Sequence, residues 1–136
     1  MVIDSSALIA VLRGEPEADV FKRAIFAAGI RLVSAVTKLE ASMVAGGTRG
    51  HAGLIDLDNI LSDLGVEIAP FDDHQASVAR DAFIRFGKGR HRAGLNFGDC
   101  AAYALAIAEA EPLLFKGTDF GATDVEVAAV GESGHI

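Results

Sequence analysis

Four acidic residues stand at widely separated points of the chain, in segments that are otherwise apolar or tightly turning. They are Asp4, Glu40, Asp99 and Asp119. An ionised carboxylate in such a segment is costly unless a cation gathers it. Several carboxylates without a Cys or His ligand set have the ligand chemistry of Mg²⁺ or Mn²⁺. The pattern therefore predicts a divalent-metal site and, with it, phosphodiester chemistry.

Each of these acids also has an ordinary structural explanation. Asp4 could be a plain helix N-cap, and Asp119 could be a turn residue. Asp99 falls in the first turn of a predicted helix, where an acid complements the macrodipole. Glu40 has mostly apolar neighbours three and four positions away, so its carboxylate follows a largely buried stripe. Its alternative role is a pair with a buried Arg or Lys.

Three polar residues close to these acids could support them through hydrogen bonds. They are Ser6, Asn96 and Thr118. Ser6 comes two residues after Asp4, and helix capping would explain it equally well. Asp124 is a weaker alternative acid near the same loop as Asp119.

Basic residues gather in one short segment of an acidic chain. They are Arg85, Lys88, Arg90 and Arg92, with His91 among them, against a net charge of −7 and a pI of about 4.9. The global charge argues against nonspecific binding to nucleic acids. The local segment could contact an RNA backbone, dock an acidic partner, or be a solvated loop. No stacking platform for bases is evident, because Phe97 is expected in the core.

Strands and helices alternate along the chain, which predicts a mainly parallel sheet of roughly five strands with helices on both faces. The expected strands are 1–3, 30–34, 66–69, 113–115 and 125–130, and the expected helices are 7–12, 16–28, 35–45, 54–64, 73–86 and 98–111. The Gly-rich segment 46–50 is expected to be a loop. Ligands bind outside the carboxyl ends of parallel strands, and all four acids can reach that edge.

The bulk properties set the class of protein. The 136 residues fit one domain, 1–130, followed by a tail, 131–136. No apolar run approaches the ~18 residues of a membrane span, and no secretory signal is visible. Cys100 is the single cysteine, so no disulfide can form within the chain, which suits a reducing compartment. We therefore expect a cytoplasmic protein without a membrane partner.

Four sequence blocks, in this order, resemble the PIN-domain ribonucleases, and most of all the VapC toxins of bacterial toxin–antitoxin pairs. They are MVIDSSALIAVL, SAVTKLEASMV, GLNFGDCAAYALA and PLLFKGTDF, and the resemblance extends from Met1 to about Val130. It implies a three-layer α/β/α fold and cleavage of RNA, with tRNA or another structured RNA among the candidates and Mg²⁺, or Mn²⁺ as the alternative, as cofactor. It also implies inhibition by a cognate antitoxin, and a homodimer.

The resemblance assigns the metal to the acids already named. Asp4 and Asp99 match the family's metal-binding acids, and Glu40 matches the acid of its "LE" helix. Many relatives have D-x-D-F where this chain has Gly117, Thr118, Asp119 and Phe120. The fourth acid is therefore either Asp119 or partly missing.

Two other readings of the chain compete with this one. A phosphotransfer domain also places an Asp at a strand end, but a receiver needs an early acidic pair and a late Lys, for which Lys116 is the only candidate. A non-catalytic PIN-like module that binds RNA or protein would follow from a degenerate metal site. Apolar residues of the early helices, Leu8, Leu12, Phe21 and Ile25, could form an antitoxin groove, although core packing is their default role.

Overall fold

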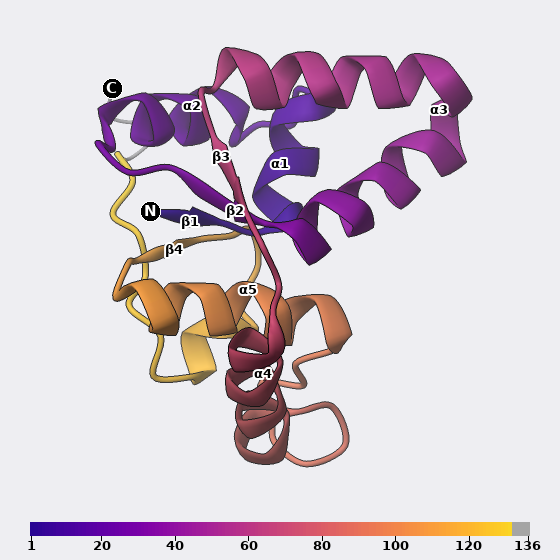
Figure 1. Cartoon of the computed structure of the whole chain (residues 1–136). Helices are drawn as coiled ribbons and strands as arrows, with labels where there is room; N and C mark the ends of the chain where they lie inside the picture. The colour runs from indigo at the N-terminus through magenta and orange to yellow at the C-terminus, as the bar shows by residue number, and fades with distance from the viewer. Residues whose placement is uncertain (132–136) are drawn as a thin grey trace.

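A computed structural model describes residues 1–131 as strands and helices that alternate along the chain (Figure 1). The strands are Val2–Ile3 (β1), Leu32–Ser34 (β2), Glu67–Ala69 (β3) and Leu113–Leu114 (β4). The helices are Ser5–Leu12 (α1), Ala18–Ala27 (α2), Ala35–Asp63 (α3), Asp73–Phe86 (α4) and Phe97–Glu109 (α5), and a short 3₁₀ helix covers Phe120–Ala122 (η1). Most strands are one or two residues shorter than predicted.

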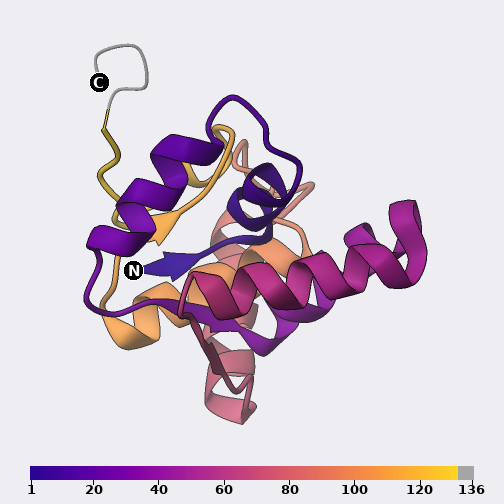
Figure 2. The same cartoon turned by 90° about the horizontal axis from the view of Figure 1, so that it is seen from above.

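The four strands form one parallel sheet in the order β3-β2-β1-β4. Helices α1, α2 and α3 lie on one face of this sheet, and α4 and α5 lie on the other (Figures 1 and 2). The predicted fold class, a three-layer α/β/α domain with a parallel sheet, is confirmed.

Neighbouring residues in each strand pack into different cores, because successive side chains of a strand point to opposite faces. Those in the core beneath α4 and α5 are Val2, Leu32 and Leu113, and those in the core beneath α1, α2 and α3 are Ile3, Val33 and Leu114. The sheet is covered on both faces, which explains why β1, β2 and β4 are almost uniformly apolar. The core with α1–α3 also buries Leu8, Phe21 and Ile25, so these are packing residues.

The predicted fifth strand is reduced to a single parallel bridge between Leu113 and Val127. Two backbone hydrogen bonds of 2.9 Å hold it there, from Leu113 N to Glu126 O and from Ala128 N to Leu113 O. Val125 and Ala128 are buried, whereas Val127 is exposed. Because the buried positions are three residues apart, the segment does not keep the two-residue period of a strand.

The predicted Gly-rich loop 46–50 is also different, because α3 runs on as a helix and bends at Gly50. Gly50 has φ 59° and ψ −142°, a conformation that favours glycine. After the bend the helix returns close to its first half, where a Cβ on Gly53 would overlap with the carbonyl of Ala45. Burial of Ala41 and Ala45 therefore outweighs the cost of about 1 kcal/mol for each glycine inside a helix.

The predicted tail, 131–136, lies outside the described residues except for Gly131, so the division into domain and tail stays a prediction. Within residues 1–131, none of the helices is long and apolar enough to cross a membrane.

Candidate active site

Asp4 follows β1 directly and caps α1, as its position predicts. Its Oδ2 accepts a hydrogen bond of 3.0 Å from the Ser6 backbone N–H, and its own N–H donates to Leu114 O over 2.9 Å. The residue is only 2% exposed, and its second oxygen, Oδ1, is buried without a hydrogen-bond partner. Helix capping thus accounts for one carboxylate oxygen and leaves the other unexplained.

Glu40 reaches the same region from the first half of α3, which follows β2. Its carboxylate lies against Gly98 of α5, so closely that a Cβ at position 98 would overlap with it. Its Oε1 is buried without a partner. No Arg or Lys pairs with Glu40 in residues 1–131, so the alternative of a buried ion pair is not observed there.

Asp99 is held by a reciprocal cap at the start of α5. Asn96 Oδ1 accepts a 2.9 Å hydrogen bond from Asp99 N, and Asp99 Oδ2 accepts one of 3.1 Å from Asn96 N. Asn96, predicted as a supporting residue, therefore fixes the backbone and side chain of Asp99. Asp99 therefore has the predicted structural role in capping α5, but this role uses only its Oδ2 and not its Oδ1.

Charges of neighbouring acids affect two of the four carboxyl groups. The pKa of Asp4 is raised to about 6, mainly by burial, with the charges of Asp99 and Glu40 contributing in the same direction and the hydrogen bonds from Ser6 opposing them. Burial also raises the pKa of Asp99, and there the charges of Glu40 and Asp119 contribute in the same direction. Asp4, Glu40 and Asp99 thus lie near one another at the carboxyl ends of β1 and β2, and Asp119, in the loop after β4, lies near Asp99.

The loop after β4 supplies the remaining predicted residues. Asp119 is exposed and stands at the start of η1 without a capping hydrogen bond. Thr118 is exposed, and its carbonyl accepts a hydrogen bond from Gly121. Ser6 Oγ accepts a 2.9 Å hydrogen bond from Lys116 N, so Ser6 connects this loop to α1 and Asp4.

The receiver-type role of Lys116 does not fit its contacts. Its Nζ lies 2.7 Å from Glu15 and 3.2 Å from Glu17, and in the described chain it pairs with none of the four acids. A phosphotransfer site with Lys116 beside Asp4 is therefore not formed.

The donor set suits a hard divalent cation, although the side chains do not enclose one as they lie. Within the described residues, no three His, Cys, Asp or Glu side chains are arranged to hold an ion. The unpartnered, buried oxygens of Asp4 and Glu40 nevertheless need a cation or a donor, and all the candidate ligands are carboxylate oxygens. The residues therefore fit Mg²⁺ or Mn²⁺ chemically.

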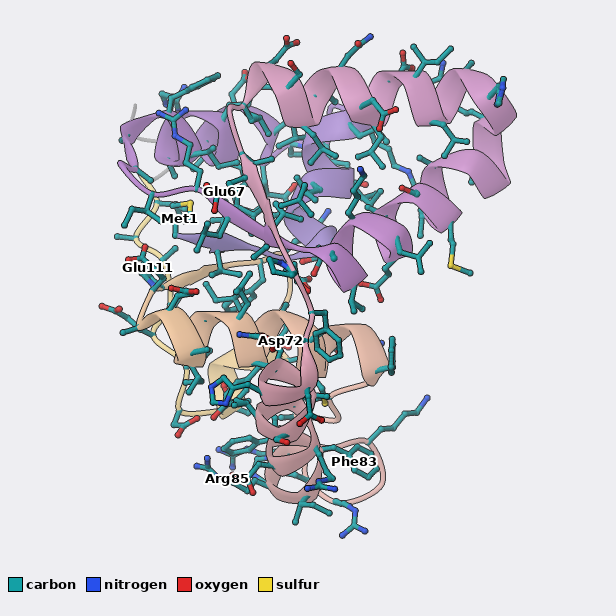
Figure 3. The ribbon with its side chains drawn as sticks, viewed as in Figure 1. Met1, Glu67, Asp72, Phe83, Arg85 and Glu111 are labelled. Atoms are coloured by element: carbon teal, nitrogen blue, oxygen red, sulfur yellow. The ribbon has the colours of Figure 1, made fainter. Side chains whose placement is uncertain are left out.

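Some residues of the basic segment pair with other residues of the described chain, and others are free to contact a ligand. Arg85 pairs with Asp124 at 3.0 Å and lies over the Phe86 ring, while the Tyr103 hydroxyl also donates to Asp124. Arg85 lies at the end of α4 that is far from Asp72, on the opposite side of the helix from Phe83 (Figure 3). Arg85 and Asp124, both candidates for the site, thus hold each other instead.

The other basic residues have fewer contacts. Arg90 lies over the Phe83 ring at 5.3 Å, and the Nδ1 of His91 accepts a hydrogen bond from Ala93 N. Lys88 and Arg92 are exposed and form no ion pair in residues 1–131. Of the predicted RNA contacts, Lys88 and Arg92 are the most available.

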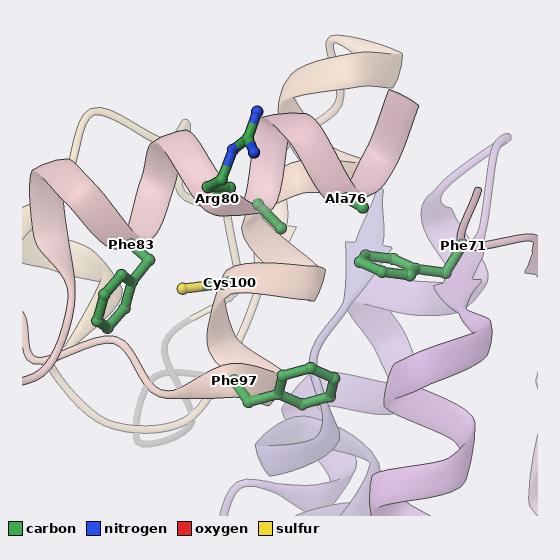
Figure 4. A pocket seen from close by; sticks show the side chains of 7 residues that line it. Phe71, Ala76, Arg80, Phe83, Phe97 and Cys100 are labelled. Carbon is green, nitrogen blue, oxygen red and sulfur yellow. The ribbon is translucent and has the colours of Figure 1, made fainter. Parts of the chain in front are cut away.

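Phe97 was expected in the core, and this expectation is wrong. Its side chain is 78% exposed at the first position of α5. Figure 4 shows it at the edge of an apolar hollow, with Phe71 and Phe83 on other sides and Cys100 between them. Helical spacing placed Phe97 on the buried stripe, but the first turn of α5 extends beyond the residues that would cover it.

A three-layer α/β/α domain with acidic residues at the carboxyl ends of its parallel strands is typical of metal-dependent nucleases. Comparison with known proteins identifies the family of the chain. The PIN domain family model matches residues 1–126. Ribonuclease VapC30 of Mycobacterium tuberculosis is 46% identical over 130 residues, which are 96% of this chain and 99% of that protein. The chain belongs to the PIN-domain family and, within it, to the VapC ribonucleases.

Further relatives agree with this assignment. A Ribonuclease VapC of Mycolicibacterium smegmatis is 46% identical over 125 residues, 92% of this chain and 97% of the relative. Among solved structures, Mycobacterium tuberculosis VapC20, described as a toxin that cleaves the sarcin–ricin loop, has a TM-score of 0.77 at 15% identity. It matches 96% of this chain and 98% of that one, a likeness that shows the shared fold.

Proposed function

We propose that this ribonuclease is the toxin of a toxin–antitoxin pair and that it hydrolyses internal RNA phosphodiester bonds with Mg²⁺ or Mn²⁺. Asp4, Glu40, Asp99 and Asp119 would hold the cation. The observation that supports this most strongly is the pair of buried, unpartnered carboxylate oxygens on Asp4 and Glu40. The charges of neighbouring acids of this set help to raise the pKa of Asp4 and of Asp99, and none of the four acids has a cationic partner in the described chain.

When bound, the cation supplies a water of lowered pKa and neutralises negative charge on the attacked phosphate. The chain's own residues hold the ligands in place. The Ser6 N–H and the start of α1 fix Asp4, the Asn96 cap fixes Asp99, and the missing side chain of Gly98 leaves room for Glu40. Asp4 and Asp99 would contact the cation directly, with Glu40 and Asp119 completing the set, because Mg²⁺ usually keeps several waters.

Phosphate binding outside the carboxylates falls to the basic segment. Lys88 and Arg92 would contact the RNA backbone, with Arg90 as a further contact, while Arg85 serves the fold through Asp124. Such contacts add salt-dependent affinity without reading sequence. A tRNA or another structured RNA remains the substrate that we propose.

Partners follow from the family. A VapBC2 structure from Rickettsia felis, bound to a DNA fragment from its promoter, is similar to this chain with a TM-score of 0.76 at 13% identity, over 96% of this chain and 98% of that one. We infer that a cognate antitoxin neutralises this chain as well. We also propose a homodimer and a cytoplasmic location, where RNA and antitoxin would both be met.

A second candidate function, a non-catalytic PIN-like module, is favoured by one observation. Gly117 stands where many PIN relatives have an acid, and in residues 1–131 the remaining acids do not enclose an ion as they lie. Such a module would bind RNA or protein without cleaving it.

One experiment separates the two functions. Purified protein is incubated with a total RNA pool and Mg²⁺, with a chelator as control, and Asp99→Asn is compared with Asp124→Asn. We expect cleavage by the wild type and by Asp124→Asn, and none by Asp99→Asn or with the chelator. No cleavage by folded wild-type protein would favour the second candidate, whereas cleavage that persists with the chelator would contradict a metal-dependent mechanism.

A further inference from the structure

The exposed ring of Phe97 forms one wall of a groove of about 540 Å³ beside the acids. The opposite wall belongs to the first half of α3, where Leu39 is 61% and Met43 is 69% exposed. Exposed apolar side chains that line one groove together form a contiguous patch, and such a patch indicates a binding surface. The groove is thus a slot with an aromatic side and an aliphatic side.

The groove is continuous with the candidate active site. Glu40 lies in its wall, and Gly98, against which the Glu40 carboxylate packs, is the next residue after Phe97. Asp99 follows Gly98 directly. A ligand group in this slot would therefore lie next to a phosphate held at the acids.

Asn96 gives the groove a hydrogen-bond donor. Its Oδ1 is occupied by Asp99 N, which orients the amide and leaves Nδ2 free of any hydrogen bond in the described chain. Asn96 is exposed and lines the groove with Phe97. An amide N–H₂ can donate to the acceptor atoms on the edge of a nucleobase.

We propose that this groove binds the base of one unpaired nucleotide beside the scissile phosphate, stacked on Phe97 and oriented by Asn96. The inference rests on the proposed ribonuclease function and adds a determinant of substrate choice to it. A base is joined to its phosphate through a single ribose, and Phe97 lines the same groove as Glu40, so a base on this ring can belong to a nucleotide whose phosphate is held at the acids. Aromatic stacking requires an unstacked base, which restricts the substrate to single-stranded or loop nucleotides at this position.

The polarity of the groove distinguishes this occupant from a second copy of the chain. Apolar side chains pressed into the groove would remove the half-buried Glu40 in its wall from water without supplying a hydrogen-bond donor, which is unfavourable. The neighbouring hollow of about 420 Å³, bordered by Phe71, Phe83 and Cys100, has no carboxylate in its wall and is not part of the proposal (Figure 4).

The test compares Phe97→Leu and Phe97→Tyr with the wild type on a single-stranded RNA oligonucleotide that contains all sixteen dinucleotide steps, in Mg²⁺. Phe26→Leu is the control, because Phe26 is 51% exposed on α2, a helix that does not line the groove. We expect Phe97→Leu to raise KM by about 10-fold or more, with kcat changed by less than about 3-fold, since stacking favours binding. Phe97→Tyr and Phe26→Leu should behave as the wild type.

A second arm removes the base instead of the ring. An abasic nucleotide on one side of the cleaved step should raise the KM of the wild type and leave the KM of Phe97→Leu unchanged. Annealing the complementary strand should suppress cleavage by the wild type. Equal KM for Phe97→Leu and the wild type would overturn this inference alone. The inference would also be overturned if Phe97→Leu lost activity and, by light scattering, had a lower molecular mass than the wild type. That result would assign the groove to contact with a second copy of the chain. No cleavage by the wild type would overturn the proposed function and this inference together.

Discussion

Two aspartates in the last part of the chain, Asp119 and Asp124, have opposite surroundings. Asp124 accepts hydrogen bonds from Arg85 and from the Tyr103 hydroxyl, and these contacts join α4, α5 and the segment after η1. Asp119 has no capping bond and no ion pair among the described residues, and it adds its charge to that of Asp99. An acid with its partners in place supports the fold, whereas acids that repel one another point to a ligand.

The pKa shifts follow the same division. The hydrogen bond from Tyr103 is the main reason that the pKa of Asp124 is lowered, so its charged form stabilises the folded state. Burial raises the pKa of Asp4 to about 6, so the charged form of Asp4 destabilises the folded state at neutral pH. The carboxylate site therefore lowers the stability of the fold, whereas the contacts of Asp124 with Arg85 and Tyr103 increase it.

The largest contrast is expected between Asp4→Asn and Asp124→Asn. Asn caps a helix as well as Asp, so Asp4→Asn should keep the fold and, by removing a buried charge, stabilise it at neutral pH by up to about 3 kcal/mol. RNA cleavage should fall by about 100-fold or more. Asp124→Asn should cleave within about 3-fold of the wild type and lose about 1 kcal/mol of stability. Denaturant unfolding and a cleavage assay measure both; an active or strongly destabilised Asp4→Asn would contradict the assignment.

Gly98→Ala, like Asp4→Asn, should lower activity without lowering stability, but the loss of activity should be smaller. The added methyl group would displace the Glu40 carboxylate, and we expect cleavage to fall by about 10-fold or more. Alanine is favoured over glycine in a helix by about 1 kcal/mol, so the melting temperature should hold or rise. Gly47→Ala is the matched control, because a Cβ at that position in α3 meets nothing within 4 Å. Equal activities of the two variants would show that the position of Glu40 does not matter.

The stability of the protein should depend on pH through the raised pKa values of Asp4 and Asp99. The folded-state pKa values of Asp4 and Asp99 are raised, so the folded protein takes up protons before the unfolded chain does. Without metal, these groups should make the protein more stable as the pH falls from about 7 toward 4, the reverse of the ordinary contribution of a paired acid. Because protons compete with the cation, Mg²⁺ should raise the melting temperature more at about pH 7.5 than at about pH 5. A gain independent of pH would place the cation elsewhere.

The smallest effects are expected in the basic segment, where Arg85 and Lys88 should differ. Lys88→Ala should weaken RNA binding by a few-fold and reduce the dependence of log K on log salt by about 0.7, as for one phosphate contact on a single strand. Arg92→Ala should do the same. Arg85→Gln should leave the salt dependence unchanged and lower the melting temperature, because it removes the partner of Asp124. Fluorescence anisotropy over a salt series measures RNA binding by the three variants. A reduced slope of log K against log salt for Arg85→Gln would show that Arg85 contacts RNA.

The sequence was sufficient to predict the parallel sheet with helices on both faces, because this arrangement depends on local patterns. Apolar strands such as β1 and β4, each followed by a capping or turning residue, set the parallel fold and its functional edge. The course of α3 through Gly46 and Gly47 was not predictable in this way, since it depends on the packing of Ala41 and Ala45 against distant residues.

The roles of Arg85 and Phe97 depended on contacts that sequence spacing does not reveal. Asp124 and Tyr103, far along the chain, determine that Arg85 is engaged. The exposure of Phe97 follows from where α5 begins relative to α3 and α4, although helical spacing places it on the same stripe as buried Cys100 and Ala104. The segment 125–130 likewise alternates in sequence, and its reduction to one bridge reflects the spacing of Val125 and Ala128.

The central claim is that Asp4, Glu40, Asp99 and Asp119 gather around a divalent cation. Isothermal titration of Mn²⁺ into the wild type, Asp99→Asn and Asp124→Asn at about pH 7.5 tests it most directly. Saturable uptake by the wild type and by Asp124→Asn, with a loss of about tenfold or more in affinity for Asp99→Asn, is the predicted result. Uptake that is absent from folded wild-type protein, or unchanged in Asp99→Asn, would contradict it.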